Sequence, residues 1–177
     1  MTKSLAAELE LLASHMLSET SGNQQLSVPA LAERIAKDLQ VKPEEVAILA
    51  VSEKHKSLNF LVPEALRNVG SIPLSSTSAL AARTARESRP DILNNFSTVR
   101  HATVFEGVRA DTLSASVIQK IISAPILFEG QVIGVIQISR KAPSLAEAGP
   151  DFTPDDLGQV LAIARPLGKL IRHAAGQ

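Results

Sequence analysis

The residues best suited to contacting a ligand gather between Asn94 and Val117. This stretch is polar and has no sustained periodicity. It mixes amides, cations, a histidine and aromatic rings, at Asn94, Asn95, Phe96, Arg100, His101, Phe105 and Arg109. A binding pocket needs a few convergent polar groups among apolar walls, and this mixture contains both. The other interpretation is a solvated loop with a short helix and two anchoring phenylalanines, and the sequence leaves both open.

A further polar residue interrupts an apolar stretch. Gln137 lies in the run from Val132 to Ile138, and in a strand it would share a side with Ile133 and Val135. A buried amide must find a hydrogen-bond partner, which is either backbone at a sheet edge or a bound ligand. Gln137 is therefore a candidate ligand-binding residue.

Little in the sequence indicates catalysis. Cysteine is absent, which excludes thiolate nucleophiles, zinc thiolate sites and thioether attachment of a chromophore. The histidines are scattered, and a lone His101 is more often a surface or helix-cap residue than a haem ligand or general base. No Ser/His/Asp order, no paired carboxylates at motif spacing and no glycine-rich phosphate loop argues for another reaction. We expect no enzyme activity, no metal site and no cofactor.

Composition narrows the class of protein. The 177 residues suit one domain with some extra helix, and 45% hydrophobic residues with a mean hydropathy of +0.12 indicate a folded chain. No apolar run is long enough to cross a bilayer, and Glu8 and Glu10 argue against a secretory signal, so we expect a cytoplasmic protein. Lys plus Arg equals Asp plus Glu and only 3% of residues are aromatic, which argues against nucleic-acid binding.

The most regular pattern runs from Ile121 to Ser139. Two runs rich in β-branched residues flank Glu129-Gly130, which predicts a β-hairpin. The second run is too apolar for a strand with one wet face, so it should be central in a sheet that is covered on both sides. Pro125 cannot donate a ladder hydrogen bond, so we expect a bulge or an edge position there.

Helices are expected at both ends of the chain. Leu5, Leu9, Leu12 and Met16 form an apolar seam in a helix from about Lys3 to Glu19. A second helix begins at Ser27, and a third ends at Ser88. The last helix begins at Pro154, with Thr153 as N-cap and Asp156 completing a capping box. Further strands are predicted at Val46–Val51, Leu58–Val62 and Ile92-Leu93.

Together these segments resemble a GAF domain, the small-molecule-sensing module of phosphodiesterases, phytochromes and bacterial signalling proteins. The hairpin, read as Ala-Pro-Ile followed by Gly-Gln-Val-Ile-Gly-Val-Ile, and the closing Phe152…Asp156 helix start are similar to the family's landmarks. The resemblance covers roughly Val28 to Ile171. It implies an α+β fold, with an antiparallel five- or six-stranded sheet. The N- and C-terminal helices would pack on one face, and a pocket-covering segment, Asn94 to Val117, on the other.

The resemblance also suggests a structural role for three residues. Ser139-Arg140, Phe152 and Asp156 lie where cyclic-nucleotide-binding GAF domains carry an Asn-Lys…Phe…Asp-Glu signature. In the family the cation and the aspartate tie the last strand to the last helix, so Arg140 and Asp156 are expected to pair as a structural brace with Phe152. Ser139 and Leu157 depart from the signature, which makes cyclic-nucleotide binding doubtful.

The resemblance implies a free-standing, non-catalytic GAF protein. Residues 1–22 would form a helix for a dimer bundle, and residues 23–177 the GAF domain. Its expected function is sensory or regulatory, binding a small molecule or a partner protein, as a homodimer in bacterial-type signalling. The alternative is an interaction or dimerisation module whose pocket is filled by Phe96, Phe105 and neighbouring aliphatic side chains. Some single-domain GAF proteins reduce free methionine sulfoxide, but that chemistry needs cysteine.

Overall fold

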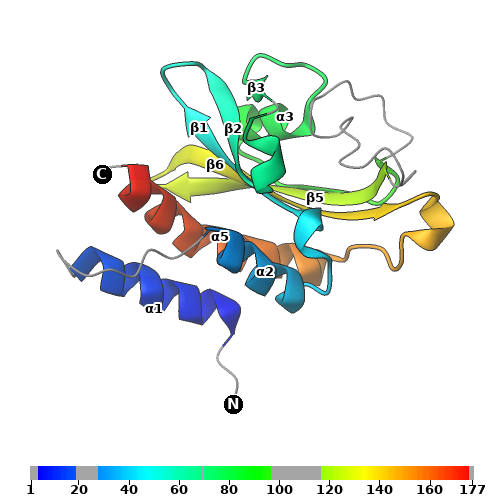
Figure 1. Ribbon diagram of the computed structural model, residues 1–177, viewed down its shortest axis with the longest axis horizontal. Coiled ribbons are helices and arrows are strands. Elements are labelled where there is room, and N and C mark those ends of the chain that lie inside the picture. The colour runs from blue at the N-terminus through cyan, green and yellow to red at the C-terminus, as the bar shows by residue number, and fades with distance from the viewer. Residues whose placement is uncertain (1–3, 19–27, 69, 97–116, 176–177) are drawn as a thin grey trace.

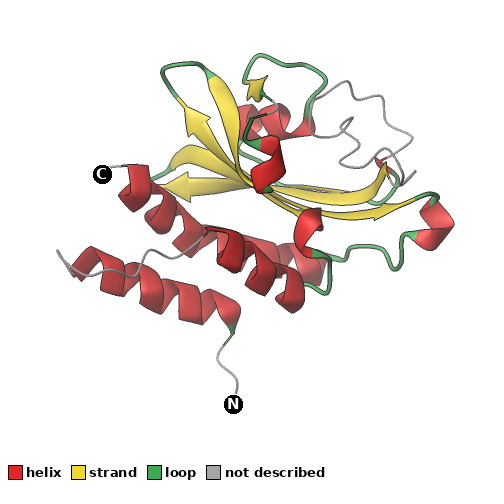
Figure 2. Cartoon of the chain, viewed as in Figure 1, coloured by secondary structure: helices red, strands yellow, loops and turns green. Residues whose placement is uncertain are grey.

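The structure is a computed structural model that describes residues 4–18, 28–68, 70–96 and 117–175. Its centre is a six-stranded sheet with the strand order β3-β2-β1-β6-β5-β4, and all of the neighbouring strands are antiparallel. Helices lie on both faces of this sheet (Figures 1 and 2). The predicted α+β fold is therefore confirmed, with six strands.

The elements follow the predicted order along the chain. The strands are β1 (Val46–Ser52), β2 (Ser57–Val62), β3 (Ser71–Pro73), β4 (Asp91–Leu93), β5 (Val117–Phe128) and β6 (Gln131–Ala142). The helices are α1 (Leu5–Ser18), α2 (Val28–Asp38), α3 (Leu80–Glu87) and α5 (Pro154–Ala175). Short 3-10 turns lie at Pro43–Glu45, Glu64–Leu66 and Leu145–Glu147.

The hairpin of β5 and β6 forms as predicted. Its two-residue turn, Glu129-Gly130, has positive φ angles of 50° and 80°, which match the right-handed twist of the flanking strands. β6 lies between β1 and β5, and its side chains from Val135 to Ser139 are buried. The prediction of a central strand covered on both sides is confirmed.

A β-bulge changes the side on which one residue lies. The register passes from Ile126↔Gly134 to Leu127↔Val132, so Ile133 is an extra residue on β6. Ile133 packs against the core below α2 and α5, whereas Val135 belongs to the core on the opposite face. The expectation that the two share a side is wrong, because the bulge interrupts the alternation.

Proline is accommodated in β5 by an edge position. β4 pairs with β5 from Ile121 to Ser123, so among the described strands Pro125 has β6 as its one neighbour. A proline nitrogen has no hydrogen to donate, and at Pro125 no second described strand lies on the side away from β6 to need one. The edge alternative of the prediction is the one observed.

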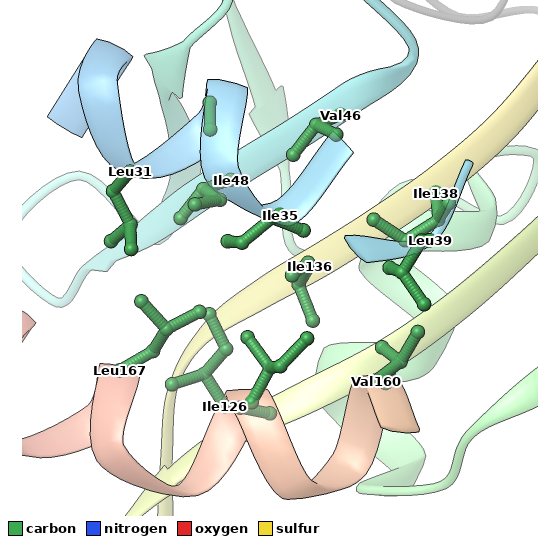
Figure 3. Packing of buried hydrophobic residues seen from close by; sticks show 14 of the residues in the cluster. Leu31, Ile35, Leu39, Val46, Ile48, Ile126, Ile136, Ile138, Val160 and Leu167 are labelled. Carbon is green, nitrogen blue, oxygen red and sulfur yellow. The ribbon is translucent and has the colours of Figure 1, made fainter. Parts of the chain in front are cut away.

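Helices α2 and α5 cover one face of the sheet, and α1 packs against these helices on the side away from the sheet (Figure 1). Figure 3 shows the interleaved aliphatic side chains of this core: Leu31, Ile35 and Leu39 from α2, Val160 and Leu167 from α5, and Val46, Ile48, Ile126, Ile136 and Ile138 from the sheet. Burying each such side chain contributes roughly 1.5–3 kcal/mol. α1 adds Leu5, Leu9 and Ala13 to the same core, so its buried face is covered by its own chain.

The N-terminus of α5 has the predicted capping box. Asp156 Oδ2 accepts a hydrogen bond from the Thr153 N–H at 2.8 Å, and Thr153 Oγ1 accepts one from the Asp156 N–H at 3.2 Å. Two helix-terminal donors are thereby satisfied by short-range contacts. The helix start is fixed by the local sequence, as predicted.

Farther along α5, Gly168 allows the helix to approach the end of β5 closely. A Cβ atom at this position would lie 2.1 Å from the carbonyl oxygen of Leu127. That oxygen belongs to the backbone, so it cannot move aside as a flexible side chain would. The contact fixes the spacing between helix and sheet.

We expect Gly168→Ala to destabilise the protein by about 1–3 kcal/mol, because the added methyl group overpacks the helix–sheet contact. Gly158→Ala is the matched control in the same helix, since its Cβ would meet nothing within 4 Å. It should stabilise by up to ~1 kcal/mol through helix propensity alone. Urea unfolding of both variants measures the difference. Equal effects would contradict the close approach.

Candidate functional site

The face opposite α1, α2 and α5 carries a second core and a group of polar side chains. α3 lies above this face in Figure 1. The core beneath it comes from the sheet, from α3 and from Phe96, which follows β4. It includes Ala47, Leu49, Leu58, Phe60, Ile72, Leu80, Phe96, Ile121 and Val135. We refer to this side of the sheet as the α3 face.

Three buried polar residues form a chain of hydrogen bonds on the α3 face. Gln137 Nε2 donates to Ser123 Oγ at 3.2 Å, and Ser123 Oγ lies 2.7 Å from Thr84 Oγ1 on α3. Thr84 in turn donates to the Leu80 carbonyl oxygen at 3.0 Å. Because the Thr84 proton is used there, the proton between the two hydroxyls comes from Ser123. The chain therefore runs in one direction, from the sheet to the helix.

The other end of the Gln137 amide is unsatisfied. Gln137 is 1% exposed, and its Oε1 has no hydrogen-bond partner among the residues that the structure describes. Exchanging the amide oxygen and nitrogen would place the oxygen beside Ser123, whose proton is already donated to Thr84, and would leave the NH₂ group without a partner among the described residues. Either orientation leaves at least one polar atom unpaired, at a cost of about 1–3 kcal/mol. The sequence indicated that the Gln137 amide needs hydrogen-bond partners. Within the described residues one end of the amide has a partner and the other end has none.

Of the other candidate residues, three are described by the structure and four are not. Phe96 is 1% exposed and lies in the α3-face core, and its neighbour Asn95 is exposed. Asn94 contacts backbone: its Oδ1 accepts from the Phe152 N–H at 2.8 Å and its Nδ2 donates to the Phe152 carbonyl at 3.1 Å. The remaining four, Arg100, His101, Phe105 and Arg109, lie outside the described residues.

The expected pair between Arg140 and Asp156 is not formed. The ion pairs between described residues do not include it, and Asp156 is engaged in the capping box. Arg140 instead lies over the Phe152 ring, 4.6 Å from its centroid, and donates to the Gln40 carbonyl at 3.3 Å. The local cap holds the carboxylate at the helix start, so the arginine contacts the aromatic ring as a cation–π pair.

Lys120 is a structural contact that the sequence analysis missed. Its buried Nζ donates to the Gly149 carbonyl at 2.7 Å and to Asp151 Oδ1 at 2.6 Å. A lysine within an otherwise largely apolar strand was the available signal, since a buried cation needs a partner. Three side chains thus converge on residues 149–152 just before α5: Asn94, which follows β4, Lys120 from β5 and Arg140 from β6.

Glu45 and Lys141 form a further polar contact at the end of β6. The Glu45 carboxylate accepts from the backbone N–H groups of Lys141 and Lys42, each at 2.8 Å. Burial lowers the pKa of the Lys141 ammonium below the usual 10.5, against the attraction of Glu45 and Glu44. The carboxylate satisfies two backbone donors, so its contacts are explained by structure alone.

Metal binding and membrane insertion find no support in the part of the chain that is described. There, no three His, Cys, Asp or Glu residues are grouped so that they could hold a metal ion. Nor does any described helix have the length and apolar character needed to cross a membrane. The polar chain ending at Gln137 is the candidate site.

Comparison with known families identifies the class of protein. The family described as GAF domain matches residues 25–171, which is most of the chain. The chain therefore belongs to the GAF domain family. A comparison with curated proteins gave no match.

Solved structures agree on the fold. The GAF domain of an Acinetobacter phosphoenolpyruvate-protein phosphotransferase is 18% identical with a TM-score of 0.67, over 99% of this chain and 97% of that one. Residues 122 to 287 of a methyl-accepting chemotaxis protein are 15% identical with a TM-score of 0.65, over 94% and 98%. A Neisseria meningitidis free methionine-R-sulfoxide reductase, solved with its substrate, is 18% identical with a TM-score of 0.58, over 99% and 95%.

The lowered pKa of Lys141 predicts a pH dependence. Between the folded-state pKa and 10.5 the unfolded chain binds more protons, so this residue's contribution to stability rises with pH and is lost as pH falls through the folded value. Urea unfolding should show wild type gaining on Lys141→Met as pH increases towards 10.5. The exposed Lys54→Met controls for loss of one positive charge. A gap between wild type and Lys141→Met that is constant with pH would contradict the prediction.

Proposed function

We propose that this GAF domain is a non-catalytic sensory or regulatory module that binds a small molecule or a partner protein on the α3 face. The observation that supports the proposal is the unpaired amide atom of Gln137, buried at the end of an otherwise satisfied hydrogen-bond chain. A ligand group with a suitable donor or acceptor would remove the desolvation penalty of this atom. The proposal also carries the expectation of a cytoplasmic protein.

The family supports a regulatory function. GAF domains are typically sensory or regulatory parts of signalling proteins, and similar folds occur in a chemotaxis protein and in a domain of a putative two-component sensor histidine kinase. We infer a function of this kind for the present chain.

The non-catalytic part of the proposal rests on the composition. Free methionine-R-sulfoxide reductases share this fold. Reduction of a sulfoxide by a thiol mechanism needs a cysteine, and the 177 residues contain none. We therefore propose that the similarity to these enzymes is one of fold and not of activity.

A second candidate function is an interaction module with a filled pocket. The observation in its favour is Phe96, which is 1% exposed and packs in the core of the α3 face beside residues of α3 itself. In that case the unpaired amide atom of Gln137 would be a small cost to stability, and no ligand would contact it.

A ligand screen separates the two functions. Thermal-shift measurements with nucleotides, tetrapyrroles and metabolites should reveal a stabilising compound, and Gln137→Leu should weaken its binding by roughly tenfold through loss of one hydrogen bond. Gln159→Leu is the matched control, since that glutamine is exposed on α5. If no compound shifts the melting temperature, the interaction module is favoured. Equal binding by both variants would exclude Gln137 from the site.

We also propose that the protein is a homodimer that associates through its helical layer. Two large hydrophobic side chains on this layer are exposed, Leu11 on α1 (48%) and Leu161 on α5 (38%). α1 already buries Leu5, Leu9 and Ala13 within its own chain, so these outer residues remain for a second copy. Apolar side chains on the outer face of a packed helix are a common feature of such interfaces.

Substitution on α5 tests the dimer. Leu161→Arg should shift the population towards monomer in analytical ultracentrifugation, because it places a charge in the proposed interface. Leu145→Arg is the control, since Leu145 is similarly exposed but belongs to the loop before α5. A monomeric wild type, or equal dissociation of both variants, would overturn this proposal.

A further inference from the structure

β4 is an edge strand of three residues in a sheet that has helices on both faces. α3 lies on one face of the sheet and α5 on the other (Figure 1). Alternate residues of a strand point to opposite faces, so neighbouring positions of β4 address different layers. Every second side chain of β4 therefore faces the same helical layer.

The contacts of β4 follow this alternation. Ile92 packs against the core of α1, α2 and α5, whereas Leu93 packs against the α3-face core. Asp91, opposite Ser123 on β5, points towards the α3 face, where its Oδ2 accepts from Arg83 Nη2 of α3 at 3.0 Å. Asn94, directly after the strand, makes its two hydrogen bonds to Phe152.

These terminal contacts attach β4 to both helices. The Arg83–Asp91 ion pair is partly buried, with side-chain exposures of 41% and 22%. At the other end, the Asn94 amide bonds both the N–H and the carbonyl of Phe152, the residue before the N-cap of α5. A side chain that makes two bonds to one backbone residue fixes both its position and its orientation.

We propose that β4 couples α3 to α5, so that a displacement of α3 is passed to the first turn of α5. The coupling runs from Arg83 to Asp91, through three residues of extended backbone, and from Asn94 to Phe152. Use of this coupling in signalling rests on the function proposed above: a molecule bound on the α3 face would alter the start of α5. The mechanical link itself does not depend on any ligand.

Hydrogen exchange of the full chain, followed by mass spectrometry without ligand, tests the link. Asp91→Asn removes the charge of the contact with α3. It should accelerate exchange in the first two turns of α5 by roughly fivefold, although Asp91 does not touch that helix. Asn94→Ala should likewise accelerate exchange in α3. The double variant should show no more than the larger single effect, because both changes break the same link.

Two controls and one reference separate coupling from general destabilisation. Glu87→Gln removes the charge of the exposed Arg89–Glu87 pair at the C-terminal end of α3, and Asn59→Ala removes an exposed asparagine from β2. Neither should change exchange in α5. The amides of β6 should keep their wild-type rates. If Asn94→Ala does not fold, Asn94→Asp replaces it, since a carboxylate still accepts from the Phe152 N–H but opposes its carbonyl.

The proposal would be overturned if each substitution accelerated hydrogen exchange only in the helix that its own side chain contacts, or if the two effects added in the double variant. Equal acceleration of exchange in β6 would also overturn it. Because no ligand is present, a failed ligand screen does not alter these results. Conversely, suppose that a ligand binds at Gln137 but hydrogen exchange in α3 and in α5 responds independently to the substitutions. The proposed function would then stand and the coupling would be rejected.

Discussion

Burial of β6 on both faces is the constraint on which the rest of the structure depends. A strand in this position needs apolar side chains above and below, and close neighbours on both edges. Gly134 shows how tight the arrangement is, since a Cβ there would lie 2.5 Å from the Leu49 carbonyl oxygen on β1. Two layers of helix follow from this strand, because each face must be covered.

The same constraint explains where buried polar side chains find hydrogen-bond partners. Lys120, Glu45 and Asn94 each contact backbone or an opposite charge near the ends of strands, where loops bring partners within reach. Gln137 lies in the middle of β6 and has Ser123 as its bonded partner among the described residues. Its unpaired atom is therefore a consequence of position, and such departures from consistent packing are most often found at functional sites.

Local patterns in the sequence predicted local features well. The hairpin turn at Glu129-Gly130 and the capping box of Thr153 and Asp156 depend on residues within a few positions of one another. The need of Gln137 for a partner also followed from its place in an apolar run. Contacts between distant segments were not predictable in this way: Lys120 and Gly149 are 29 positions apart, and Asn94 and Phe152 are 58 apart. The expected Arg140–Asp156 pair failed because a short-range cap competes for the same carboxylate.

The alternation along β4 restricts how its length can change in evolution. Inserting or deleting one residue between Asp91 and Asn94 would turn one of these side chains away from its helix, whereas a change of two residues would preserve the directions of both. We therefore expect relatives that retain both attachments to differ in β4 by even numbers of residues. The lengths of the turns on either side of β4 are not restricted to even changes in this way.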